Sequence, residues 1–378
     1  MEDLTIMIVG GDFNTQGGRP SGVVAKLAEN LGCAGKSYNG GTLDELRKFA
    51  ETAAEYDVIV WMPEVGNEED KIYPRKATGA TLICSKVLRS GYGPKDILSR
   101  IYAMRANAII VVDARDRKNC QFNLVDALGN SWNPGGKPVV SIPELGSAIL
   151  KFDTWSRGQV RWPSVQVESP GGTPICEVEP KFISLVHYLA RSYEDVVGRW
   201  YGNASSRCFF MFPSKRCVDE EHPYTTPIAV SLRNTNKKEI ATNDFVVVRL
   251  GDGYRRLEYF GDQKPSVDAA AQALIYGEPK FGHINYMIHG HAYVENAPYT
   301  EHYFPCGDMR ESADIANVMK GNQYGIMNLR NHGCLYYADS IENLRFLVGS
   351  SRFVVRGGPG IQFETIPEDA LQSEEEKK

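Results

Sequence analysis

The chain has 378 residues, of which 42% are hydrophobic and 24% charged, a composition that argues against a mostly disordered or fibrous protein. At about 100–200 residues per domain, this length predicts two domains. Forty-two basic against forty-seven acidic residues give a net charge of −5, with no basic stripe dense enough to neutralise a phosphate backbone. We therefore expect no nucleic-acid partner.

The start of the chain, its apolar runs and its cysteines predict a cytoplasmic protein. Met1 is followed by Glu2 and Asp3, so the basic start of a secretory signal is missing. No apolar run approaches the ~18–20 residues that span a bilayer, and we expect no membrane association. The eight cysteines are scattered without a CxxC pair, which predicts reduced thiols rather than a disulfide frame or a thiolate zinc site.

Residues 4 to about 150 alternate short β-branched runs with segments of helical periodicity. Thr42 and Glu45 form a capping box that opens one of the helices. Strands separated by helices imply βαβ units and a mostly parallel sheet covered on both faces. We predict a doubly wound, Rossmann-like α/β domain over residues 1–165 and a linker over 166–177, where periodicity is lost. The expected strands are 4–9, 57–62, 81–87 and 108–114.

A glycine-rich stretch, GGDFNTQGGRPSG (10–22), follows the first expected strand. A turn of this kind before a helix can offer backbone N–H groups to an anion. It is similar to the turn of the synthetases that join phosphopantothenate to cysteine, which implies a nucleotide at this domain. The spacing is not GxGxxG, and glycines needed only for a long turn are an equally good interpretation. The candidate cofactor-binding residues are Gly10, Gly11, Arg19, Ser21 and Gly22.

The second half is marked by its histidines, since five of the seven in the chain lie between His283 and His332. The segment 283–293 is strand-like through its centre, so His289 and His291 project to the same face. His332 ends another strand-like run and supplies a third imidazole. Three histidines with an open fourth position are typical of catalytic divalent-metal sites. His187, His222, His283 and His302 receive no ligand role.

Several motifs in this half resemble those of the class II aldolase/adducin family. They are GNASSR (202–207), KPSVD (264–268), IHGHAY (288–293), FPCG (304–307) and LRNHG (329–333), in the family's order. The resemblance implies an α/β/α sandwich on a mostly antiparallel sheet, a homo-oligomer that is commonly a tetramer, and zinc held by His289, His291 and His332. We assign residues 178–360 to this domain and 361–378 to an acidic tail.

The resemblance also implies an acid/base role for the acidic residue of the KPSxD motif. Fuculose-phosphate aldolase-like members carry glutamate there and ribulose-phosphate 4-epimerase-like members aspartate, so Asp268 points to the second branch. A carboxylate beside a divalent cation can move a proton while the metal polarises substrate oxygens. The alternative is a helix N-terminal residue stabilised by the helix dipole. Glu295 is the candidate for a second acid, and a solvated loop acid is its alternative.

For the substrate, the family's phosphate ligands imply roles for Asn203, Ser205, Ser214 and Ser266. Lys215 replaces the glycine of the family's PSG turn and can supply a point charge. Val267 stands where the family has a second serine, so the anion pocket must differ from the family's.

We predict a zinc-dependent lyase, or an enzyme with another divalent metal, that acts next to a carbonyl. The reaction is aldol cleavage or condensation, or epimerisation through an enediolate, on a small anionic or phosphorylated sugar-like substrate. Two alternatives stay open: an adducin-like binding or structural module without catalysis, and a nucleotide-dependent enzyme with catalysis in the first domain. The three retained histidines and the retained acid argue against the first alternative.

Overall fold

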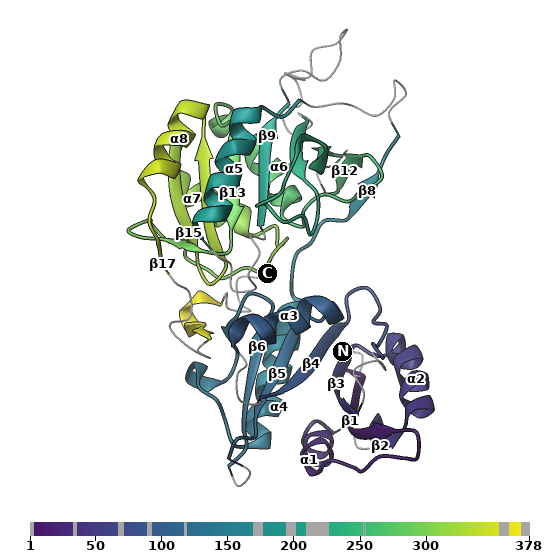
Figure 1. Cartoon of the computed structure of the whole chain (residues 1–378). Coiled ribbons are helices and arrows are strands. Elements are labelled where there is room, and N and C mark those ends of the chain that lie inside the picture. The colour runs from purple at the N-terminus through teal and green to yellow at the C-terminus, as the bar shows by residue number, and fades with distance from the viewer. Residues whose placement is uncertain are drawn as a thin grey trace. The chain divides into compact units, whose positions relative to one another are not determined.

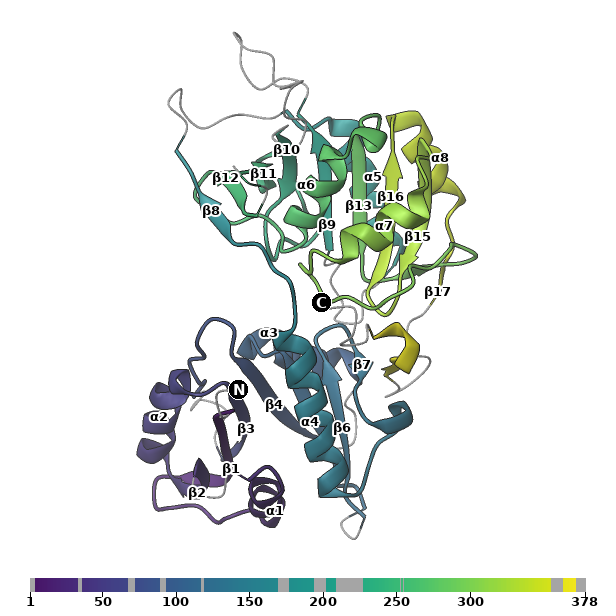
Figure 2. The same cartoon turned by 180° about the vertical axis from the view of Figure 1, so that it is seen from behind.

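The computed structural model describes residues 4–32, 36–66, 72–88, 93–116, 119–168, 177–193, 202–208, 227–251, 253, 255–354 and 363–371. The chain divides into two compact units. Unit 1 is Met1–Gln159 with Gly357–Ile366, and unit 2 is Val160–Arg356 with Pro367–Lys378. Figures 1 and 2 show the elements of each unit from opposite sides. Among the described residues, no helix combines the length and the apolar character needed to span a membrane.

Unit 1 is built on an eight-stranded sheet in the order β18-β7-β6-β5-β4-β3-β1-β2. The first five strands along the chain pair in parallel, β6 and β7 add antiparallel, and β18 pairs in parallel with β7. The strands are β1 (Ile6–Asn14), β2 (Ser37–Thr42), β3 (Val58–Val65), β4 (Thr81–Leu88), β5 (Ala108–Asp113), β6 (Gln121–Asp126), β7 (Asn130–Ser131) and β18 (Glu364–Thr365).

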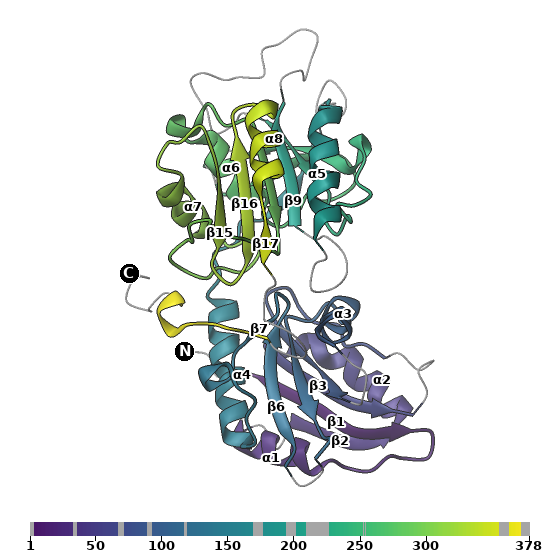
Figure 3. The same cartoon turned by 60° about the vertical axis from the view of Figure 1, so that its left-hand side comes forward.

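Helices cover both faces of this sheet. Helices α1 (Gly22–Asn30) and α4 (Ile142–Arg157) contact each other on one face, and α2 (Leu43–Thr52) and α3 (Pro94–Met104) lie on the other, as Figure 3 shows. From β1 the chain runs outward to β2 and then returns to place β3 on the opposite side of β1. This reversal of direction confirms the predicted doubly wound, mostly parallel sheet.

Unit 2 is built on a second sheet, in the order β15-β16-β13-β9-β10-β11-β12-β8. All neighbours pair antiparallel except β12 and β8. The strands are β8 (Ser164–Gln166), β9 (Gly202–Arg207), β10 (Ile228–Ser231), β11 (Phe245–Leu250), β12 (Leu257–Phe260), β13 (Tyr286–Gly290), β15 (Tyr324–Leu329) and β16 (Gly333–Ala338), while β14 (Tyr293–Val294) and β17 (Phe353–Val354) form a separate two-stranded ribbon.

Two helix layers enclose the second sheet (Figure 3). Helices α5 (Pro180–Ser192) and α8 (Ile341–Ser350) contact each other on one face, and α6 (Ala269–Gly277) and α7 (Glu311–Met319) on the other. Successive side chains of a strand point to opposite faces, so Val230 of β10 packs with α6 and α7 while Ala229 packs with α5 and α8. The structure thus has the α/β/α sandwich expected for this half.

Two short strands pair with a sheet other than the one that the expected domain boundaries would give them. Ser164–Gln166, at the end of the expected first domain, pairs with β12 of unit 2. Glu364–Thr365, in the expected acidic tail, pairs with β7 of unit 1. Strands of two or three residues carry no readable periodicity, so the sequence could not reveal either pairing. Most of the expected linker, residues 169–176, lies outside the described residues.

The predicted capping box is present at the start of α2. The Glu45 N–H donates to Thr42 Oγ1 at 3.3 Å, and the Thr42 N–H donates to Glu45 Oε2 at 2.7 Å. Replacing Thr42 by Ala should cost about 1 kcal/mol of helix stability. Amide hydrogen exchange in the first turn of α2 should therefore quicken about fivefold. Thr52→Ala, at the last residue of α2, is the control and should leave that turn unchanged.

Candidate metal centre

The three candidate histidines lie together because the end of β13 and the turn between β15 and β16 are at the same end of the sheet of unit 2. His289 is in β13, His291 follows the end of that strand, and His332 lies in the turn between β15 and β16. Strand β16 runs antiparallel to β13 and pairs Cys334 with Gly290, so its start adjoins the end of β13. A Cβ at position 333 would lie 2.0 Å from the Gly290 carbonyl oxygen, so only glycine permits this approach.

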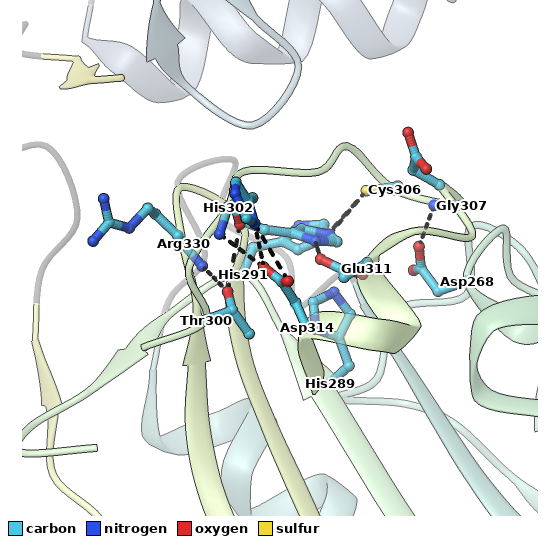
Figure 4. A network of polar contacts seen from close by, with 12 residues as sticks. Asp268, His289, His291, Thr300, His302, Cys306, Gly307, Glu311, Asp314 and Arg330 are labelled. Carbon is cyan, nitrogen blue, oxygen red and sulfur yellow. Dashed lines mark hydrogen bonds and ion pairs between the residues drawn. The ribbon is translucent and has the colours of Figure 1, made fainter. Parts of the chain in front are cut away.

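The geometry of the three imidazoles suits one metal ion (Figure 4). Ring centroids are 4.6 Å apart for His289 and His332, 5.2 Å for His289 and His291, and 5.6 Å for His291 and His332. One nitrogen of each ring lies within 4.8 Å of the corresponding atoms of the other two, and all three side chains are buried. Tetrahedral zinc with nitrogen ligands at ~2.0–2.1 Å places its donor atoms about 3.4 Å apart. The three donors thus form a single group, within a limit that is wider than that spacing.

His289 provides the test of whether a metal fits. Its Nδ1 is 2.9 Å from the Cys334 carbonyl oxygen, which can only accept, so Nδ1 carries the proton. Its Nε2 is buried and has no hydrogen-bond partner among the described residues. Burial, reinforced by the nearby His332, lowers the pKa of His289 well below its ordinary value. A neutral imidazole with an unused, buried lone pair is the form that binds a divalent metal.

The orientation of His332 is fixed by an acid that the sequence did not reveal. Glu311, the first residue of α7, is buried, and its Oε1 lies 2.6 Å from His332 Nδ1. Burial, together with neighbouring carboxylates, raises the pKa of Glu311 well above its ordinary value. A carboxylate behind a ligating histidine sets the tautomer and increases the basicity of the ligand.

Asp268 lies beside the histidines at the start of α6, with both carboxylate oxygens held. The Gly307 N–H donates to Oδ1 at 2.7 Å, and the Asn203 side-chain amide donates to Oδ2 at 3.1 Å. Burial acts to raise the pKa of Asp268, but the three imidazoles outweigh it and hold the pKa below its ordinary value. The carboxylate makes no capping hydrogen bond to α6, all of which is described.

A thiol also borders the site. Cys306 Sγ lies 3.3 Å from His332 Nε2 and 3.9 Å from His291 Nε2. Ligand atoms of Asp268, Cys306 and His332 form a second group within 4.8 Å of one another. From the sequence this cysteine belongs to the FPCG motif and is predicted to be a reduced thiol, without a ligand role.

The other predicted site residues of unit 2 differ in whether they contact the residues around the histidines. Asn203 contacts Asp268, as described, whereas Ser205 is fully buried and its Oγ lies 3.3 Å from the Tyr276 hydroxyl. Ser266 is buried, and its N–H donates to the Ser231 carbonyl oxygen. Glu295 lies in an exposed loop and belongs to neither ligand group. Ser214 and Lys215 lie outside the described residues.

Positive charge gathers near Asp268 from residues that the sequence analysis did not select. Lys237 is only 1% exposed, and its ammonium donates to the Thr235 carbonyl oxygen at 2.8 Å. Burial lowers the pKa of Lys237 to about 8, although the charge of Asp268 opposes this. Desolvation and the nearby Arg161 lower the pKa of Arg233, which also interacts with Asp268. Lys237 and Arg233 therefore both interact with the charge of Asp268, and Arg161 lies near Arg233.

Part of the glycine-rich stretch of unit 1 belongs to a strand and to a helix, whereas the sequence predicted a turn. Gly10 and Gly11 lie within β1, and Gly22 is the first residue of α1. The Ser21 N–H donates to Asn39 Oδ1 at 2.7 Å, and the Arg19 carbonyl accepts from the Asp12 N–H. Part of the stretch is thus held by contacts within unit 1. Binding of a nucleotide there stays a prediction.

Comparisons with known proteins identify similar solved structures, while no protein-family model and no curated protein matches the chain. L-fuculose 1-phosphate aldolase is 19% identical, with 45% of this chain and 78% of that chain covered and a TM-score of 0.32. A sugar-phosphate aldolase from Thermotoga maritima is 11% identical, covering 45% and 89%, with a TM-score of 0.33. The N-terminal class II aldolase domain of a conserved protein from Thermoplasma acidophilum is 15% identical, covering 50% and 94%, with a TM-score of 0.31.

The contact between Glu311 and His332 generates a test of the metal site. Replacing Glu311 by Gln keeps the shape of the side chain but removes an acid that can ionise when a metal binds to His332, so affinity for Zn²⁺ should fall about 10- to 100-fold. Competition with a chromogenic chelator measures this affinity. The control is Asp314→Asn in the same helix, because Asp314 contacts His302 instead. Equal weakening by both variants would contradict the assignment.

Proposed function

We propose that this chain is a divalent-metal-dependent enzyme that acts next to a carbonyl group of a small anionic substrate. The reaction class is aldol cleavage or condensation, or epimerisation by breaking and remaking the same bond. One observation carries the proposal: the buried, unpartnered Nε2 of His289 faces a group of imidazoles with a buried carboxylate beside it. A binding module without catalysis has no use for such a costly arrangement.

His289, His291 and His332 are the residues that would hold the metal. Three imidazoles without an all-thiolate shell favour Zn²⁺. When bound, the cation supplies positive charge that polarises a carbonyl oxygen and stabilises the negative charge developing there. Glu311 keeps the ring of His332 in place, and the Cys334 carbonyl does the same for His289.

Asp268 is the residue that we assign to proton transfer. Its pKa lies below the ordinary value, so the carboxylate is ionised and ready to accept a proton near neutral pH. Hydrogen bonds from Gly307 and Asn203 to its two oxygens fix the plane of the carboxylate. A fixed carboxylate can take a proton from a substrate hydroxyl or carbon and return it without a change of rotamer.

The anionic end of the substrate is assigned to the cations near Asp268. Lys237 has three donor protons, and among the described residues its ammonium donates one of them to the Thr235 carbonyl oxygen. A buried ammonium gains most from an anionic partner, because water cannot compensate for its lost hydration. Arg233 and Arg161 extend the same region of positive charge. This supports a carboxylate or phosphate on the substrate.

The experiment that tests the function combines metal analysis with a screen of phosphorylated and unphosphorylated sugars. Wild-type protein should contain about one divalent metal ion per chain. Asp268→Asn should keep that metal but lose at least about 10²-fold in turnover, since general acid/base catalysis contributes this much or more. The matched control is Asp262→Asn, at an exposed aspartate six residues earlier. A wild-type protein without metal that is unaltered by His289→Ala would overturn the proposal.

A second prediction concerns Lys237 and pH. The ammonium is charged below its pKa of about 8 and neutral above it, so KM for an anionic substrate should rise as pH increases through that value. Lys237→Met should raise KM at neutral pH about 10- to 100-fold, the equivalent of one charge-assisted hydrogen bond, and flatten the pH profile. Steady-state kinetics from pH 6.5 to 9.5 measure both effects. Lys238→Met, at the neighbouring lysine, should leave the profile unchanged.

A further inference from the structure

The thiol of Cys306 stands where a fourth ligand of the metal would be. Its sulfur is 3.3 Å from Nε2 of His332 and 3.9 Å from Nε2 of His291. In a tetrahedral site with Zn–N of ~2.0–2.1 Å and Zn–S of ~2.3 Å, sulfur and nitrogen donors are about 3.5 Å apart. The two observed distances bracket this value. Figure 4 shows Cys306 directed towards the imidazoles.

The backbone on both sides of this thiol is held in place. The carbonyl of Cys306 accepts a hydrogen bond from Arg161 Nη2 at 3.3 Å, and the N–H of Gly307 donates to Asp268 at 2.7 Å. Gly307 has a φ of +81°, a backbone conformation that glycine adopts without strain. These contacts hold the backbone from which the side chain of Cys306 projects, beside the ring of His332.

An independent observation at the same centre points to a ligand. The side chain of His289 is 2% exposed, and its Nε2 has no hydrogen-bond partner among the described residues. One ring nitrogen of His289 belongs to the group of three imidazole donors within 4.8 Å of one another. The thiol thus borders a donor set that already contains an unused lone pair.

We propose that the Cys306 thiolate is the fourth metal ligand in the substrate-free protein, giving a tetrahedral His₃Cys site. The inference rests on the proposed metal function and adds to it. The thiol proton leaves to solvent as the bond between sulfur and metal forms. A substrate oxygen must then displace the thiolate or enter as a fifth ligand. A sulfur donor also favours Zn²⁺ or Co²⁺ over Mg²⁺ or Mn²⁺.

Cobalt substitution of the full chain tests this ligand without any assay of turnover. Wild-type protein with one Co²⁺ per chain should show a near-ultraviolet charge-transfer band from thiolate to cobalt, together with the visible bands of tetrahedral Co²⁺. Cys306→Ser and Cys306→Ala should lose the near-ultraviolet band but keep the cobalt. Their affinity for Zn²⁺ should fall at least about 10-fold, because a ligand contributes no less than an outer-shell partner does.

The matched control is Cys120→Ser, which makes the same change at a partly buried cysteine of unit 1 and should keep the band. A second measurement needs no variant: bound Zn²⁺ should slow alkylation of Cys306 by iodoacetamide, as followed on its peptide by mass spectrometry. Stoichiometric cobalt without a thiolate band, or alkylation of Cys306 unaffected by zinc, would overturn the ligand while leaving the three-histidine site standing. A protein that takes up no cobalt would overturn the metal site itself.

Discussion

The hydrogen bond between His289 Nδ1 and the Cys334 carbonyl is the contact on which the arrangement of the centre depends. The pairing of β13 with β16 places that carbonyl, and because it can only accept, the proton of the imidazole must lie on Nδ1. The lone pair on Nε2 then faces the other histidines instead of the strand. A buried lone pair left unpartnered costs about 1–3 kcal/mol, and a metal bond offsets that cost. The register of β13 and β16 thus determines which nitrogen of His289 carries the proton.

The sheet and the helices contribute different chemistry to the centre. The imidazoles lie at the end of β13 and in the turn between β15 and β16. The acids lie at the starts of the two helices on one face, with Asp268 before α6 and Glu311 as the first residue of α7. The positive end of a helix dipole stabilises a carboxylate at that position. Burial and neighbouring carboxylates favour the protonated form of Glu311, whereas the three imidazoles favour the ionised form of Asp268.

The sequence predicted the site residues that are marked by strand periodicity, by a turn or by a short motif. Period-two geometry and a glycine turn were enough to bring His289, His291 and His332 together, and the KPSVD motif was enough to select Asp268. Glu311 was missed because its partner is 21 residues away in the chain and nothing beside it signals a ligand. Glu295 was selected for its place in a loop, yet that loop is exposed. Likewise, β8 and β18 are too short for any periodicity, so only long-range pairing defines them.

Strand β18 has a consequence for how the protein is made. Its residues, Glu364–Thr365, complete a sheet whose other strands all precede residue 132, and the whole sheet of unit 2 is encoded between them. On the ribosome, unit 1 must therefore wait for its last edge strand until unit 2 has been synthesised. Until then β7 has an open edge, which is a site where other chains can add a strand. Pairing of β18 with β7 closes that edge.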